Sequence, residues 1–227
     1  MIANRQITVV KGNRQERTTK ITASTLMRLA GLAAMVAGLC YIVVGIFHPA
    51  NVLASVTTPT WVIVHIFAMA MSFFGLLGMV GLYARQVEKA GWLGLVGFVL
   101  FSLWLALVMC FSFVETLILP QLATELPTFV DGFMGMFAGA ASETNLGSLP
   151  TLWMISGPMY MLGGLLFGVA TFRAGILSRW AGVILAGGTL SAPVAVLLPY
   201  EGLVTLPVGL ALAWLGYTLW SERRESF

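Results

Sequence analysis

Charged residues are scarce in this chain: they make up 9% of its 227 residues, whereas 59% are hydrophobic. Soluble domains carry roughly 25% charged residues, so this chain lacks the polar surface that a water-exposed globule needs. Its mean hydropathy of +0.93 agrees with that conclusion. The scarcity of charge therefore excludes an ordinary soluble domain and indicates an integral membrane protein.

Motifs for several familiar chemistries are also missing. The chain has no HExxH, GxSxG, CxxC or nucleotide-binding glycine loop, which removes the corresponding enzyme classes. Its lysines all flank the apolar runs, so a retinal Schiff base is excluded. The two cysteines, Cys40 and Cys110, lie inside separate apolar runs. We interpret them as small core residues, although their similar depth leaves a bond between them open.

Long apolar runs are what the sequence does contain. Six of them are long enough for helical spans, at about 25–47, 60–83, 91–119, 151–172, 180–199 and 203–220. A backbone in lipid must satisfy its own hydrogen bonds, and the alternation of barrel strands is absent, so we predict helices. The predicted fold class is an all-α transmembrane bundle of about six helices at 25–220. A basic tail at 1–24, expected to be disordered, precedes it, and a short tail at 221–227 follows.

The lysines and arginines predict the orientation of this bundle. With six crossings, all twelve fall on one side of the membrane. The positive-inside rule makes that side cytoplasmic, with both termini there, in a multi-pass plasma-membrane protein. The net charge of +3 thus follows topology, and we expect no nucleic-acid partner. Trp61 and Trp153 begin the second and fourth runs at the outer interface. The charged residues on the external side are all acidic: Glu125, Asp131, Glu143 and Glu201.

Small residues recur along the runs at helical spacing. Such stripes allow helix backbones to approach closely, and we interpret them as packing within the bundle. A homo-oligomer formed through these glycine-rich faces is the alternative, and the lipid bilayer is the expected partner in either case. The stripes are Gly75, Gly78 and Gly81; Gly91, Gly94 and Gly97; and Gly164 and Gly168.

One long external connection covers about 120–150. Phe129, Phe133 and Phe137 are spaced four residues apart within it. This spacing predicts a short amphipathic helix, which either lies on the outer membrane surface or folds over the mouth of the bundle. A lid over a site is a further alternative.

Four polar residues at the outer half of the bundle form the candidate site: His48, His65, Glu115 and Glu201. Polar groups inside a membrane are costly, so each requires an explanation. His65 lies about five residues inside the second run and Glu115 about five residues before the end of the third, so both are roughly 7 Å below the outer boundary. Because consecutive spans are usually neighbours, we expect these two side chains to meet.

Three interpretations of these residues remain open. His48, His65 and Glu115 together suit a metal ion, since imidazole and carboxylate ligands bind zinc and similar ions. His48 and His65 alone are also a possible axial pair for a single haem. The third interpretation is a structural His65–Glu115 hydrogen bond that joins two helices, with His48 at the interface.

Three segments carry a resemblance to known proteins: HPANVLASVTTPTWVIVH at 48–65, GLYARQVEKAGWLGLVGFVL at 81–100 and RAGILSRWAGVILAGG at 173–188. Together they resemble a group of uncharacterised bacterial polytopic membrane proteins that are grouped as a domain of unknown function. The resemblance covers about 25–220. It implies six helices and a bacterial plasma membrane, and it implies no activity and no catalytic residue.

The sequence therefore favours a non-enzymatic membrane protein that binds or senses a small ligand at its outer face, or serves as an accessory subunit. A metal- or haem-dependent membrane enzyme or redox protein is the first alternative. A small-molecule transporter is the second.

Overall fold

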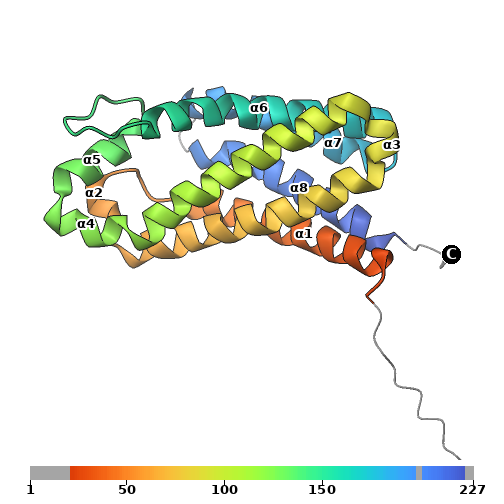
Figure 1. Ribbon diagram of the computed structural model, residues 1–227, viewed down its shortest axis with the longest axis horizontal. Coiled ribbons are helices and arrows are strands. Elements are labelled where there is room, and N and C mark those ends of the chain that lie inside the picture. The colour runs from red at the N-terminus through yellow and green to blue at the C-terminus, as the bar shows by residue number, and fades with distance from the viewer. Residues whose placement is uncertain (1–20, 198–200, 223–227) are drawn as a thin grey trace, which may run out of the picture.

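A computed structural model describes residues 21–197 and 201–222. This part of the chain is helical and contains no strand, which confirms the all-α class. The predicted tails lie almost entirely outside the described residues. The helices are α1 (Ala23–Phe47), α2 (Leu53–Val56), α3 (Pro59–Leu117), α4 (Leu119–Glu125), α5 (Pro127–Met136), α6 (Leu149–Ala174), α7 (Arg179–Leu190) and α8 (Thr205–Ser221), with 3-10 turns η1 (Ala192–Leu197) and η2 (Glu201–Val204) (Figure 1).

Four helical segments of the described chain are long and apolar enough to cross a membrane. They are α1, α3, α6 and the stretch Gly202–Ser221 that contains α8. These segments support the prediction of a membrane protein. The predicted run at 25–47 corresponds to α1, the run at 151–172 to α6 and the run at 203–220 to α8.

Helix α3 is a hairpin of two arms, 59–90 and 92–117. A straight helix of its 59 residues would extend about 90 Å, three times the thickness of a bilayer core. The chain reverses at Gly91, whose φ of 57° and ψ of −158° are open to glycine and strained for other residues. Tyr83 and Phe98 stack across the arms, with ring centroids 4.9 Å apart. The two arms correspond to the predicted runs at 60–83 and 91–119.

A second hairpin joins α6 to α7 through Gly175, which has a φ of 62°. Helix α7 has 12 residues and ends at Leu190, where the chain continues into η1. The prediction of one continuous helix over 180–199 is therefore wrong beyond Leu190. The reason is local: Gly187 and Gly188 are poor helix formers, and Pro193 lacks a backbone N–H.

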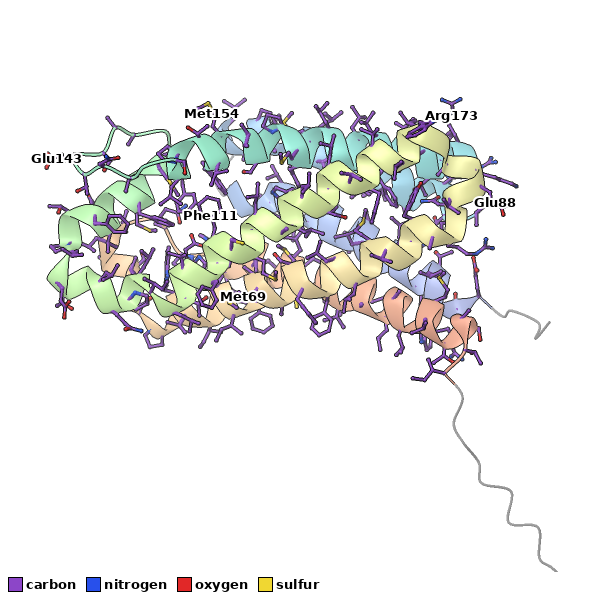
Figure 2. All side chains as sticks on the ribbon, in the orientation of Figure 1. Met69, Glu88, Phe111, Glu143, Met154 and Arg173 are labelled. Atoms are coloured by element: carbon purple, nitrogen blue, oxygen red, sulfur yellow. The ribbon has the colours of Figure 1, made fainter. Side chains whose placement is uncertain are left out.

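The five long helices form a closed ring in which each has two main neighbours. Going round it, α8 contacts α1, α1 contacts α3, α3 contacts α6, α6 contacts α7, and α7 returns to α8. The termini of the bundle and both hairpin turns lie at one end, and α2, α4 and α5 lie at the other (Figure 1). Figure 2 shows Glu88 and Arg173 at the first end and Glu143 at the second. Following the predicted orientation, we name these the inner and the outer end.

Several of the glycines in the predicted stripes are contact points inside this ring. A side chain at Gly78 would overlap Ala34 of α1, and one at Gly97 would overlap the backbone at Phe167 of α6. These glycine faces are therefore occupied within the chain, and the homo-oligomer stays a prediction. Both cysteines are free: Cys40 is buried as expected, whereas Cys110 is exposed on the outside of the bundle.

Candidate functional site

The α3 hairpin brings His65 and Glu115 together. The two residues lie at nearly equal distances along the chain from Gly91, as Gly75 and its neighbour Leu105 do. Nε2 of His65 is 3.4 Å from Oε2 of Glu115, and both side chains are buried. The meeting that the sequence predicted is therefore present in the fold.

Trp61, one helical turn before His65, fixes this pair in place. Its carbonyl oxygen accepts a hydrogen bond from Nδ1 of His65 at 2.7 Å. Its indole Nε1 donates to the backbone carbonyl of Glu115 at 2.8 Å and so connects the two arms of α3. The Trp61 and His65 rings also contact each other, with centroids 4.1 Å apart. Because Trp61 is completely buried, these contacts hold the histidine in one orientation.

The hydrogen bond to Trp61 defines the role left to Nε2 of His65. Since Nδ1 donates to a carbonyl, Nε2 of a neutral ring carries a lone pair and can only accept a hydrogen bond. Its separation of 3.4 Å from Oε2 of Glu115 exceeds that of an ordinary N–H···O bond. Nε2 is buried and has no hydrogen-bond partner.

His48, which follows the last residue of α1, completes the cluster. Its ring lies edge-on to His65, with centroids 5.1 Å apart. Its Nδ1 donates to the carbonyl of Pro49 at 2.7 Å, so this ring too has Nε2 as its remaining acceptor. Burial lowers the pKa of His48, and His65 lowers it further, whereas Glu115 and the Pro49 carbonyl act in the opposite direction. His48 is therefore neutral at physiological pH.

These groups line a cavity of about 210 Å³ near the outer end of the bundle. The walls are mainly apolar and aromatic, and they come from α1, both arms of α3, α6 and the residue that follows α5. Figure 2 shows Phe111, one of these residues, on α3 toward the outer end. The lining residues are Tyr41, Val44, His48, Asn51, His65, Ala68, Met71, Trp104, Val108, Phe111, Ser112, Glu115, Phe137 and Trp153.

The outer helices cover this cavity. Phe133 of α5 is fully buried and contacts Phe111, in a cluster separate from the main core. Phe137 packs against Trp153 of α6 with centroids 4.7 Å apart, and both rings are half-buried at the rim. The amphipathic segment is thus folded over the mouth of the bundle, as one of the two predicted alternatives had it.

The described residues contain no group of three or more His, Cys, Asp or Glu side chains arranged to hold a metal ion. A haem does not fit between His48 and His65, because the two rings touch each other directly and leave no space for a porphyrin. Glu201 begins η2, and its side chain lies outside the described part of the chain. Its membership of the site stays a prediction.

Several residues that hold the His65–Glu115 pair or line the cavity were not predicted from the sequence to belong to a site. Trp61 was assigned to the membrane interface, although its position one turn before His65 is a signal that the two side chains interact. Tyr41 and Trp104 form the inner floor, where Tyr41 donates a hydrogen bond to Tyr160 at 3.1 Å. Nothing in their spacing distinguishes them from ordinary core aromatics.

A wider hollow of about 530 Å³ lies at the inner end, between the start of α1 and the end of α8. Its polar lining residues, such as Arg28 and Glu222, are exposed or half-exposed. Arg28 lies over the Trp220 ring at 5.6 Å, and Glu222 pairs with Arg85 at 2.6 Å. We interpret this hollow as a surface groove, and the outer cavity as the candidate site.

Comparison of the chain with protein-family models, with curated proteins and with solved structures finds no match. The resemblance to bacterial polytopic membrane proteins therefore stays a prediction.

Proposed function

We propose that this chain is a six-span membrane protein that binds a small ligand in its outer cavity. Both termini are cytoplasmic, the membrane is a bacterial plasma membrane, and the protein is a binding, sensing or accessory subunit rather than an enzyme. The single observation that supports the binding role is that Nε2 of His65 is buried and has no hydrogen-bond partner, although His65 lines the cavity.

A buried polar atom without a partner costs about 1–3 kcal/mol, so a fold that retains one generally has a use for it. The ring is held by Trp61, and the cavity beside it provides room for a ligand group. At about 210 Å³ the space is smaller than the roughly 300–1,000 Å³ of sites for drug-sized ligands. The ligand is therefore small, with one polar group and an apolar remainder.

Six crossings account for the helix lengths. The bend at Gly91 divides α3 into two arms, each long enough to span. Helix α7 and η1 together extend about 30 Å, the thickness of a bilayer core. With α1, α6 and α8 this gives six crossings, and the basic hairpin turns all lie at one end.

Cysteine labelling tests this topology in a background that lacks Cys40 and Cys110. The Glu143→Cys variant is expected to react with a membrane-impermeant maleimide in intact cells, and the Glu88→Cys variant only after lysis. Labelling of Glu88→Cys in intact cells contradicts the six-span arrangement. Because Glu143 and Glu88 lie at opposite ends of the bundle, the two reactions report on opposite sides of the membrane.

Occupancy of the cavity tests the binding role. Protein is purified in lipid nanodiscs, and small molecules released on denaturation are identified by mass spectrometry. Ala68→Phe fills the cavity and is expected to abolish the co-purifying molecule, because Ala68 is a lining residue. Val80→Phe, on the same arm but exposed on the outside, is the matched control and is expected to retain it. Equal recovery from the two variants contradicts the proposal.

A divalent metal ion is the second candidate occupant, favoured by one observation. His48 and His65 both donate Nδ1–H to backbone carbonyls, as metal-binding histidines usually do with the ring nitrogen that does not face the metal. Elemental analysis by mass spectrometry of the wild type and of His65→Ala tests it. Near-stoichiometric zinc or iron that disappears in the variant establishes the metal site, and absence of metal from both samples removes it.

A further inference from the structure

We infer that the outer cavity binds a small organic ammonium ion that carries N–H donors, held between Glu115 and the two histidines. This inference rests on the proposed binding function and names the chemical class of its ligand. Three properties of the cavity support it: the sign of its charge, the kind of hydrogen-bonding groups it offers, and its aromatic walls.

The charge of the lining excludes an anionic ligand. Glu115 is the only acidic residue among the lining residues, and no lysine or arginine is among them. A negatively charged ligand would be buried beside a carboxylate without a counter-ion, which is a costly arrangement. A cation reverses the sign of that interaction and compensates the carboxylate.

The hydrogen-bonding groups select a donor. Nδ1 of His48 and of His65 already donate to backbone carbonyls, so each neutral ring can only accept through Nε2. The Glu115 carboxylate also accepts. A ligand with a primary ammonium group matches them because its three N–H bonds are donors only.

The walls are suited to a cation with an aromatic or alkyl body. Among the lining residues are Tyr41, Trp104, Phe111, Phe137 and Trp153, whose ring faces carry partial negative charge. Cations within about 6 Å of such faces are attracted, and this attraction strengthens when water is excluded. The apolar part of the ligand is accommodated by the same rings.

Isothermal titration calorimetry on the protein in lipid nanodiscs tests this with three probes that share a phenylethyl body. They are 2-phenylethylammonium, 2-phenylethanol, and the N,N,N-trimethyl derivative of the first. We expect the primary ammonium to bind about 10- to 100-fold more tightly than the alcohol, because its hydrogen bonds in a buried site are charge-assisted and therefore stronger than neutral ones. The trimethyl ion retains the charge and lacks the donors, so it is expected to bind with intermediate affinity.

Glu115→Gln is expected to remove the preference for the ammonium ion over the alcohol. Glu143→Gln, the same change in the exposed outer loop, is the matched control and is expected to leave it unchanged. Because the comparison among probes is made in the wild type, the inference remains testable if Glu115→Gln fails to fold.

The outcomes separate the inference from the proposed function. Binding of 2-phenylethanol as tight as that of the ammonium ion, at the cavity that Ala68→Phe closes, overturns the ammonium class and leaves the binding function standing. Failure of all three probes to bind, together with tight binding of zinc chloride, overturns the inference in favour of the metal site. Failure of all probes and of zinc, with no co-purifying molecule, overturns the proposed function itself.

Discussion

The inner and outer halves of this bundle bury polar groups in opposite ways. In the inner half, glycines bring helix backbones into direct contact, and Gln86 donates a hydrogen bond to Thr171 at 2.9 Å between α3 and α6. In the outer half, α3 and α6 meet through the rings of Phe111 and Trp153, and the polar pair of His65 and Glu115 borders a cavity. Helices α3 and α6 contribute to both halves.

The difference shows that side-chain size, rather than polarity, decides whether space is left between helices. Close backbone packing in the inner half surrounds Gln86 completely. In the outer half the large rings of Trp104, Phe111 and Trp153 line a cavity that they do not fill. Substitutions that enlarge a side chain in the inner half or in the outer half therefore test this difference in packing directly.

The largest effect is expected from Gly97→Leu. A Cβ atom at this position would overlap the backbone of Phe167, which cannot move aside as a flexible side chain can. Overpacking costs typically 1–3 kcal/mol, and a clash with backbone belongs at or above the top of that range, about 3 kcal/mol or more. Thermal unfolding in detergent measures the loss. Gly157→Ala is the control, because nothing lies within 4 Å of its Cβ position; a loss there as large as that at Gly97 would contradict the packing argument.

A matched pair of alanine substitutions comes next. Ala34→Leu places a larger side chain against Gly78 in the tightly packed region, and we expect it to cost about 1–3 kcal/mol. Ala68→Leu directs the same three carbon atoms into the outer cavity, and we expect a change smaller than about 1 kcal/mol. Both free energies of unfolding can be obtained from denaturant titration in mixed micelles. Equal losses would mean that the cavity is not available space.

The sequence predicted the parts of this structure that depend on spacing and composition. Apolar runs identified the helices, and depth from the membrane boundary was enough to pair His65 with Glu115, because the arms of a hairpin are in register about their turn. Spacing could not show that α7 ends at Leu190, since a glycine pair and a following proline terminate a helix without interrupting an apolar run.

The cavity was beyond prediction for a different reason. It depends on how Tyr41, Trp104 and Trp153 from three helices fit together, and this fit is a property of packing that no local pattern records. The role of Trp61 illustrates the limit. A tryptophan at a membrane boundary is ordinarily an interfacial residue, and only the fold shows its indole donating to the carbonyl of Glu115.

The hydrogen bond of the inner half gives a medium-sized effect. Thr171→Val removes the acceptor of Gln86, whose Oε1 already lacks a partner, and we expect a loss of about 1–2 kcal/mol. Adding Gln86→Leu removes the stranded amide, so the double variant is expected to regain most of that loss. A double-mutant cycle of unfolding free energies gives the coupling directly. Additive losses in the double variant would show that the amide is satisfied by another group.

The smallest effect is expected at the floor of the cavity, where Tyr41 donates to Tyr160 at 3.1 Å. Hydrogen bonds between membrane helices average about 0.6 kcal/mol, so Tyr41→Phe is expected to cost about that much in thermal unfolding. Tyr160→Phe is expected to cost more, because it leaves the Tyr41 hydroxyl as a buried donor without its acceptor. Since neither hydroxyl belongs to the acceptor group of His48, His65 and Glu115, both variants are expected to bind 2-phenylethylammonium within about threefold of the wild type. A larger loss of binding in Tyr41→Phe would show that the polar end of the ligand binds at the inner floor of the cavity and not at His65 and Glu115. The boundary between the packed half and the binding half of the bundle would then lie at Tyr41 and Tyr160.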